Sequence, residues 1–401
     1  MRTPLESAHA LQQAREQMDA LFRLVRPGSL YERPIGERHR IIFYLGHADA
    51  FDWNLIARYG LDVPAFHEGF DRLFAFGIDP PPGELPRDEA ADWPALAEVE
   101  RYQQRTRATI DQLLGEVPEQ LLHVAIEHRL MHAETFAYIL HQLEYGKKVA
   151  PHNGVPGDRR ADHGDGARVG PGVRPAVGPT EVLPIAAGLA NLGLASNGSF
   201  GWDNEFQTHT VEVPAFSVAQ YKVTNGEYLD FVKEGADPPF FWADRGAGWV
   251  FRGMFAEYPL PLDAPVYVTH GEAARYARWR GMRLPSEAEY HRAAGDAPRS
   301  SNLNFRHWDP VPVTADDDGT RRPMQLAGNG WEWTSTVFAP FPGFRPFPFY
   351  RNYSEPFFDG AHYVLKGASP RTAECFLRPS FRNWFRPSYP YVYATFRMVK
   401  P

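Results

Sequence analysis

Apolar residues recur at helical spacing through the first 150 residues of the chain. In the first predicted helix they are Leu11, Met18, Leu21, Phe22 and Val25. The same spacing, which makes one face of a helix apolar, predicts further helices over about 38–59, 93–115 and 118–145. Four long helices joined by loops are typical of a helix bundle.

The pattern changes after residue 150. Residues 151–180 contain seven glycines and five prolines without apolar periodicity, which predicts a linker. From 181 to 401, short apolar runs alternate with turn residues, and helical spacing is confined to about 271–280 and 286–294. We therefore predict a helical domain over 1–150 and a mixed α+β domain over 181–401.

The composition narrows the possible functions. A length of 401 residues predicts two domains, and a net charge of −7 argues against a nucleic-acid-binding protein. The single cysteine, Cys375, rules out an internal disulfide and a metal site built from cysteines, and it favours a cytoplasmic location. The first residues lack the apolar core of a signal peptide, and no run approaches about 18 apolar residues, so no membrane span is expected.

The last of the predicted helices carries two histidines within the segment Glu127–Glu134 (EHRLMHAE). His128 and His132 are four residues apart, so they lie on one face of the helix, one turn apart. Two imidazoles so placed can bind one metal ion, and imidazole suits zinc, copper, iron and nickel. On spacing alone, however, solvated or hydrogen-bonded helix histidines are the simpler interpretation, since a chain with 15 histidines is expected to contain roughly 0.5 such pairs by chance.

A metal site would need a third ligand from elsewhere in the bundle. The histidines available are His39, His47, His67, His123 and His141. His47 follows the apolar run 41–46, so it could point into the bundle interior, although its local sequence fits a core histidine bonded to a backbone carbonyl better. Glu134 lies two residues beyond His132 and points elsewhere around the helix, which suits a hydrogen-bonding role.

The His-x-x-x-His-x-Glu motif at His128, His132 and Glu134, together with His47 upstream, resembles the DinB-like bundle of the ergothioneine-type sulfoxide synthases. The resemblance implies that His47, His128 and His132 bind iron(II). It also implies the fold class α+β, with a DinB-like four-helix bundle over 1–150 that carries the metal ligands.

The second half resembles the formylglycine-generating-enzyme-like domain, a variant of the C-type lectin fold. The matching segments occur in the family's order and are 202–205 (WDNE), 221–225 (YKVTN), 283–290 (RLPSEAEY), 328–334 (GNGWEWT), 365–369 (LKGAS), 382–385 (RNWF) and 396–398 (FRM). With the bundle, the resemblance covers nearly the whole chain apart from the linker at 151–180. It implies that residues 181–401 form a mixed α+β domain that completes the substrate pocket.

The activity implied by this resemblance is the O2-dependent attachment of a chalcogen atom to C2 of the imidazole ring of hercynine, which is Nα-trimethylhistidine. A metal centre favours such a reaction because it brings the chalcogen donor, the imidazole and O2 together. The trimethylammonium group of hercynine suits an aromatic pocket, because the faces of aromatic rings attract cations.

The resemblance also assigns residues to substrate. Asn383 is expected to form a hydrogen bond to hercynine, and Trp384 and Phe385 are candidates for cation–π contact with its trimethylammonium group. Met131 stands where some relatives carry glutamine for the hercynine carboxylate, so this contact differs here. A tyrosine near the iron donates a proton in the family, and the candidates in this chain are Tyr350 and Tyr353.

The region after the second bundle helix bears on the chalcogen donor. Relatives that use γ-glutamylcysteine carry arginines there, which pair with the carboxylates of the donor. Residues 74–84 (FAFGIDPPPGE) contain no basic residue, and the next one is Arg87. This stretch resembles the bacterial selenoneine synthases, which implies a selenosugar donor. The alternative is an ergothioneine synthase that uses a thiol donor, either cysteine or γ-glutamylcysteine.

Other classes of function remain as alternatives. A formylglycine-generating oxidase needs a pair of active-site cysteines, and this chain has only Cys375. A non-catalytic lectin-like binding module, with the bundle as a scaffold, would purify without stoichiometric iron. A DinB-like thiol transferase would not need the large second domain.

Overall fold

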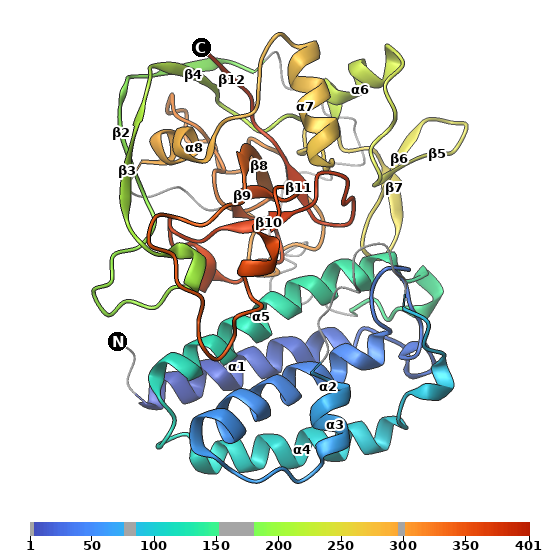
Figure 1. Ribbon diagram of the computed structural model, residues 1–401. Helices are drawn as coiled ribbons and strands as arrows, with labels where there is room; N and C mark the ends of the chain where they lie inside the picture. Colours follow the sequence, from blue (N-terminus) through green and yellow to red (C-terminus); the bar gives the residue numbers. More distant parts are fainter. Residues whose placement is uncertain (1–3, 76–85, 152–179, 296–300) are drawn as a thin grey trace. The chain divides into compact units, whose positions relative to one another are not determined.

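The computed structural model describes residues 4–75, 86–151, 180–295 and 301–401. The chain divides into two compact units, Met1–Pro151 and His152–Pro401 (Figure 1). Residues 152–179, which make up nearly all of the predicted linker, lie outside the described residues. The same holds for 76–85, where the donor-binding region was predicted.

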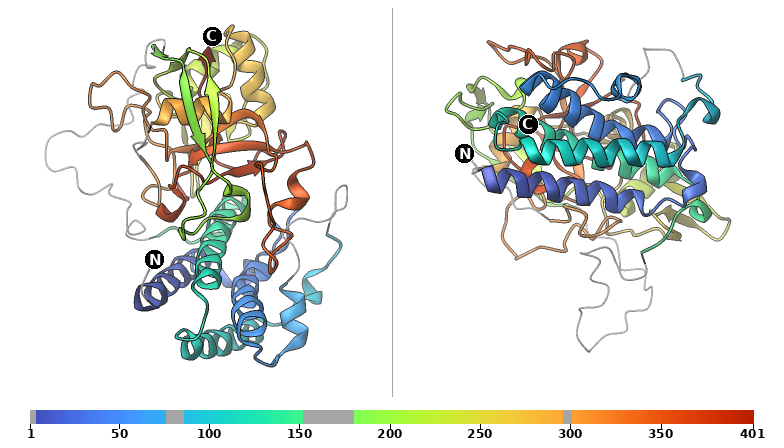
Figure 2. Two further views of the ribbon diagram at one scale, coloured as in Figure 1. Left: turned by 60° about the vertical axis from the view of Figure 1, so that its left-hand side comes forward. Right: turned by 90° about the horizontal axis from the view of Figure 1, so that it is seen from below.

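The first unit is a four-helix bundle, as the apolar spacing predicts. Its long helices are α1 (Pro4–Phe22), α2 (Ile41–Asp52), α4 (Leu96–Leu113) and α5 (Glu119–Gln142) (Figure 1). Helix α1 packs against α5, and α2 packs against both α4 and α5. Seen from below, α1, α5 and α2 run side by side (Figure 2).

Burial along the helices follows their sequence patterns. Ten of the twelve residues of α2 are buried, because this helix is apolar on nearly every side and lies inside the bundle. Helix α4 is amphipathic and buries a single stripe at three- and four-residue intervals. The residues of that stripe are Val99, Tyr102, Gln103, Thr106 and Ile110.

Two features of the first unit differ from the prediction. The helix predicted over about 38–59 is α-helical only from Ile41 to Asp52 and continues as a π-helix over Trp53–Gly60. A short helix, α3 (Glu68–Leu73), was not predicted, and the imidazole of His67 caps it by accepting a hydrogen bond from the backbone N–H of Phe70. Both depend on hydrogen-bond register, which apolar periodicity does not specify.

The second unit combines small sheets with short helices. Its described strands are β1 (Val182–Ile185), β2 (Gly188–Leu192), β3 (His209–Val213), β4 (Phe216–Ala219), β5 (Trp242–Asp244), β6 (Trp249–Arg252), β7 (Glu257–Pro259), β8 (Gly330–Val337), β9 (Tyr363–Ala368), β10 (Asn383–Phe385), β11 (Ala394–Thr395) and β12 (Val399–Lys400). They pair in the orders β1-β4-β12, β2-β3, β5-β6-β7 and β10-β9-β8-β11. The mixture of helices and sheets confirms the predicted α+β class.

The sheet β10-β9-β8-β11 carries three of the seven predicted motifs of the second unit, on β8, β9 and β10 (Figure 1). Strands β8 and β9 are antiparallel, with Gly330 opposite Ala368, and β11 runs parallel to β8. Strand β10 is an edge strand that pairs antiparallel with β9, with Asn383 opposite Leu365. The predicted substrate residues therefore lie at one edge of this sheet.

Three helices of this unit begin with a capping box, in which a hydroxyl and a glutamate satisfy each other's backbone N–H groups. They are α6 (Asn225–Lys233), α7 (His270–Trp279) and α8 (Glu287–Ala294). The prediction included α7 and α8 but missed α6. Its signal was present in the sequence, because Thr224 and Glu227 have the spacing of a capping box.

Candidate metal centre

Three histidines meet inside the helix bundle. His47 lies on α2, and His128 and His132 lie one turn apart on α5; all three are buried. Nε2 of His132 lies 3.2 Å from Nε2 of His47 and 3.1 Å from Nε2 of His128. Among the described residues, this is the one group of three or more His, Cys, Asp or Glu side chains whose ligand atoms all lie within 4.8 Å of one another.

Hydrogen bonds among the three rings cannot satisfy every Nε2 atom at the centre of the group. Nδ1 of His47 lies 2.6 Å from the carbonyl oxygen of Phe74. Because a carbonyl only accepts, this nitrogen carries the proton, and Nε2 of a neutral His47 carries a lone pair. Nε2 of His132 has two close nitrogen neighbours, and one hydrogen can satisfy only one of these contacts. Three neutral imidazoles therefore cannot satisfy one another here, whereas a shared cation can accept all three lone pairs.

The spacing of the nitrogens fits a shared metal ion. With metal–nitrogen bonds of about 2.1 Å, two nitrogens 3.1–3.2 Å apart subtend an angle of roughly 95–100° at the ion. This angle lies between those of octahedral and tetrahedral coordination. Three protein ligands also leave coordination positions for other molecules, and imidazole donors accept iron, zinc and copper alike.

The protonation state of the group favours metal binding. Burial lowers the pKa of His47 to about 4, against a smaller opposing effect of its bond to Phe74. Burial and the neighbouring imidazoles hold the pKa values of His128 and His132 well below the ordinary value. All three rings are therefore neutral at pH 7, which is the form that binds a metal ion.

Aromatic rings pack against two of the imidazoles. The ring of Phe43 stacks on His47 with centroids 4.8 Å apart, and that of Phe51 stacks on His128 at 3.4 Å. Both come from α2, one turn before and one turn after His47. Their packing limits how far the imidazole rings can rotate.

A buried ion pair connects the two helices that carry the histidines. Arg129 of α5, which is 1% exposed, donates to Asp49 Oδ1 at 2.8 Å and to Asp52 Oδ2 at 2.5 Å, and both carboxylates lie on α2. Burial alone would raise the pKa of Asp49, but Arg129 and Arg107 outweigh it and hold this pKa below its usual range. Burial raises the pKa of Asp52, which has fewer partners.

The same network extends to the other two helices. Asp49 also accepts hydrogen bonds from Gln103 and Arg107 of α4, at 2.8 and 2.9 Å. Arg107 in turn pairs with Asp19 of α1 at 2.7 Å. Asp49, two residues after His47, therefore links α2 to α4 and α5 directly, and Arg107 extends this network to α1.

The remaining candidate ligands of the bundle lie apart from this group. His39 packs against Phe43 with the two rings tilted, His67 caps α3, and His123 pairs with Glu119 one turn away at 3.5 Å. The three-histidine group does not include His141, which is buried near the end of α5. Met131 and Glu134 are half-buried on α5.

The predicted substrate residues Asn383, Trp384 and Phe385 form strand β10, and all three are half-buried. Side chains alternate along a strand, so Trp384 lies on the opposite face from its two neighbours. Trp384 packs against Phe338, with centroids 4.2 Å apart, whereas Phe385 stacks on Tyr389 at 5.3 Å. The structure therefore separates the two predicted cation–π residues into different surroundings.

The two candidate tyrosines lie close to each other in the second unit. The ring of Tyr353 stacks on Trp202 at 4.0 Å and meets Trp384 edge-on at 5.3 Å. Tyr350 lies 5.6 Å from Tyr353. Burial, with a smaller effect of Asp203, raises the pKa of Tyr350 above its ordinary value, so its hydroxyl keeps its proton at neutral pH.

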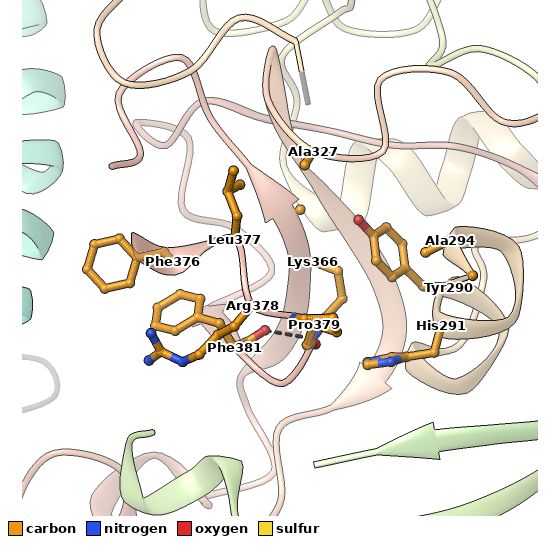
Figure 3. Close-up of a pocket in the computed structure, with 12 residues that line it drawn as sticks. Tyr290, His291, Ala294, Ala327, Lys366, Phe376, Leu377, Arg378, Pro379 and Phe381 are labelled. Carbon is orange, nitrogen blue, oxygen red and sulfur yellow. Dashed lines mark hydrogen bonds between the residues drawn. The ribbon is translucent and has the colours of Figure 1, made fainter. Parts of the chain in front are cut away.

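A small hollow of about 30 Å³ also lies in the second unit, lined by residues of α8, β9 and the segment after β9 (Figure 3). The two cationic side chains that line it, Lys366 and Arg378, already have hydrogen-bond or ion-pair partners. Lys366 donates to the carbonyls of Pro379 and Phe381, at 2.8 and 2.6 Å, and Arg378 pairs with Glu205 at 2.6 Å. A hollow of this size holds water rather than an amino-acid-sized ligand.

Known proteins resemble this chain over both units. Residues 173–321 match the family model of the sulfatase-modifying factor enzyme 1-like domain. A hercynine oxygenase of Mycolicibacterium thermoresistibile is 32% identical, and the match covers 78% of this chain and 77% of the relative. A second hercynine oxygenase, from Mycolicibacterium smegmatis, is 33% identical and covers 73% of this chain and 74% of the relative. Ergothioneine biosynthesis protein 1 of Schizosaccharomyces pombe is 28% identical over 94% of this chain, which spans 54% of that protein.

A helix bundle with a buried three-histidine group, followed by a domain of the formylglycine-generating-enzyme type, defines a two-unit protein able to hold a metal ion. The chain belongs to the family of the hercynine oxygenases, the ergothioneine-type sulfoxide synthases. Within the described residues, no helix combines the length and hydropathy needed to cross a membrane.

The sequence did not reveal several residues around the histidines. The carbonyl of Phe74 has no sequence signature, because every residue carries one. Asp49, Asp52 and Arg129 had a usable signal, since charged residues inside otherwise apolar helices need buried partners.

Proposed function

We propose that this chain is an iron(II)-dependent enzyme that uses O2 to attach a chalcogen atom to C2 of the imidazole of hercynine. The observation that supports it most is the buried group of three neutral histidines in a member of the hercynine oxygenase family. In this reaction the C2–H bond and the chalcogen–hydrogen bond are replaced by one carbon–chalcogen bond. The electrons and protons released are taken up by O2.

His47, His128 and His132 would hold the metal. Iron(II), when bound, supplies the redox chemistry through which O2 can react. The protein itself keeps the three imidazoles neutral through burial and fixes the proton of His47 on Nδ1 through Phe74. It also keeps water and competing ligands away from the buried side of the centre.

We assign the trimethylammonium group of hercynine to the surroundings of Trp384. Phe338, Tyr353 and Phe357 all lie within 5.5 Å of this indole, centroid to centroid. Aromatic faces arranged in this way attract quaternary ammonium ions. Asn383 is proposed as a hydrogen-bonding residue for hercynine, Tyr353 or Tyr350 as the proton donor, and Met131 as a residue near the hercynine carboxylate.

We propose a selenosugar as the chalcogen donor, which makes the reaction a step of selenoneine synthesis. The support is the sequence 74–84, which has no basic residue to pair with the carboxylates of a peptide thiol. The alternative is formation of a carbon–sulfur bond with cysteine or γ-glutamylcysteine. The relatives support this alternative, because they are named hercynine oxygenase and ergothioneine biosynthesis protein 1.

Metal analysis of the purified chain beside His128→Ala tests the proposal, followed by incubation with hercynine and a donor under air. We expect about one iron per chain, lost in the variant, and a hercynine product enlarged at C2. A folded chain that neither contains iron nor gains activity with added iron(II) would refute the enzyme and leave a non-catalytic binding module.

The donor is tested separately by supplying a selenosugar, cysteine or γ-glutamylcysteine with hercynine and identifying the products by mass. Product from the selenosugar alone supports selenoneine synthesis. Product from γ-glutamylcysteine and none from the selenosugar would show that the enzyme forms carbon–sulfur bonds.

A further inference from the structure

A glycine directly precedes the proposed metal ligand His47 in α2. The aromatic ring of Phe74 lies against this glycine, Gly46. A Cβ atom at position 46 would lie 2.5 Å from Cε1 of Phe74 and 2.6 Å from its Cδ1 and Cζ. Carbon atoms in contact normally stay about 3.5 Å apart or more, so only glycine leaves room for the ring here.

We propose that Gly46 is a positioning residue for His47. By admitting the ring of Phe74, it places the Phe74 carbonyl where that carbonyl holds the imidazole by its Nδ1–H. The inference rests on the proposed function, because it takes His47 to be a metal ligand through Nε2.

The glycine is otherwise unfavourable at this position. In the interior of a helix, glycine is less stable than alanine by about 0.5–1 kcal/mol. Gly46 is buried in the middle of α2, and its φ angle is helical, so the backbone does not require a glycine. The close approach of Phe74 is the contact that does require one.

The ring of Phe74 cannot easily move away from an added methyl group. It is fully buried and has further aromatic neighbours in Phe70 at 5.4 Å, Tyr102 at 6.2 Å and Trp93 at 6.3 Å. A densely packed ring that is pushed from one side transmits the displacement to its own backbone. That backbone carries the carbonyl that binds His47.

A displaced carbonyl would change how His47 presents Nε2. The 2.6 Å hydrogen bond fixes both the proton on Nδ1 and the orientation of the ring. Loss of such a partner behind a metal-binding histidine typically weakens metal affinity by about 10–100-fold. We therefore expect Gly46→Ala to weaken metal binding more than its effect on stability would explain.

The test measures the dissociation constant for Co(II), by competition with a chromophoric chelator, in the full chain. Hydrogen exchange of α2 in the metal-free chain is measured in parallel. Gly46→Ala should raise the dissociation constant by about tenfold or more. Gly60→Ala is the matched control, at the far end of the π-helix. Its added methyl would meet the flexible tip of Leu121 at 2.8 Å and the carbonyl oxygen of Leu55 at an ordinary contact distance of 3.4 Å. This control should leave the dissociation constant within about twofold of the wild type.

The double variant Gly46→Ala/Phe74→Leu tests the route of the effect and remains informative if Gly46→Ala alone does not fold. Without the ring the methyl group has room, so the double variant should bind Co(II) about as tightly as Phe74→Leu alone. Unchanged Co(II) affinity in Gly46→Ala overturns the inference, as does a double variant that binds about tenfold more weakly than Phe74→Leu. Wild-type protein that binds Co(II) no better than His128→Ala would instead refute the metal centre itself.

Discussion

Replacing Arg129 with methionine removes the charge that holds two buried carboxylates of α2. Asp49 would keep its bonds to Arg107 and Gln103. Asp52 would lose its one side-chain hydrogen bond among the described residues, and it is fully buried. Removing one partner of a buried ion pair destabilises a protein by about 3–5 kcal/mol, and we expect Arg129→Met to lie in this range at neutral pH.

The stability lost in Arg129→Met should depend on pH. Burial already raises the pKa of Asp52 in the folded chain above its ordinary 3.8, and removal of Arg129 raises it further. Between the unfolded and folded pKa values the native state binds more protons than the unfolded state, so stability falls as the pH rises through this window. Arg129→Met should therefore lose more stability at about pH 8 than at about pH 5.

Hydrogen exchange of amides in α5 measures the effect within the first unit alone. Arg129→Met/Asp52→Asn should recover part of the loss, because the carboxylate left without a partner becomes neutral. Arg72→Met is the control: it breaks the Arg72–Glu68 pair, whose side chains are 74% and 72% exposed, and should change stability by less than about 0.5 kcal/mol. A loss below about 1 kcal/mol in Arg129→Met, or no recovery in the double variant, would refute this reasoning.

Two further predictions concern the second unit. Trp384→Leu should raise the KM for hercynine by about tenfold, while Phe385→Leu, on the opposite face of β10, should change it less. Equal effects in steady-state kinetics would contradict the assignment to Trp384. Burial lowers the pKa of His270 to about 4. As the pH falls, the unfolded state therefore takes up the proton before the folded state does. The free energy of unfolding decreases from about pH 6.5 downward, by at most about 3 kcal/mol at pH 4. Urea unfolding of His270→Gln should show a shallower dependence on pH over this window, and an unchanged slope would argue against a buried neutral His270.

The sequence was sufficient for the helices of the bundle because each long helix has a continuous apolar face. It was less informative where structure depends on distant contacts. Apolar spacing predicted a helix through Trp53–Gly60 but not its π-helical hydrogen bonding, and the short helix α3 was not predicted. Helix α6 was missed although Thr224 and Glu227 carried its capping signal. Apolar spacing identifies faces, whereas these elements depend on hydrogen bonds at their ends.

The histidine group, too, could be predicted from the sequence only in part. Helical spacing placed His128 and His132 on one face, but it did not choose a third ligand, and His47 came from the family resemblance. Its local sequence favoured a core histidine bonded to a backbone carbonyl. The structure shows that bond, to Phe74, while Nε2 of the same ring faces His132. The two interpretations were not exclusive, because an imidazole has two nitrogens and each can serve one of them.

The centre of the bundle combines features that rarely stabilise a protein by themselves. Buried ion pairs such as Arg129 with Asp49 and Asp52 give little net stability, and three neutral imidazoles with facing nitrogens leave a lone pair unsatisfied. An apolar core of the same volume would pack as well without these groups. A cation at the centre of these groups would explain why they lie together. The lone pairs of the imidazoles would become its ligands, and the ion pairs would keep α2 and α5 aligned. Local arrangements that are unfavourable for folding alone are expected at functional sites, and in this bundle they converge on His47, His128 and His132.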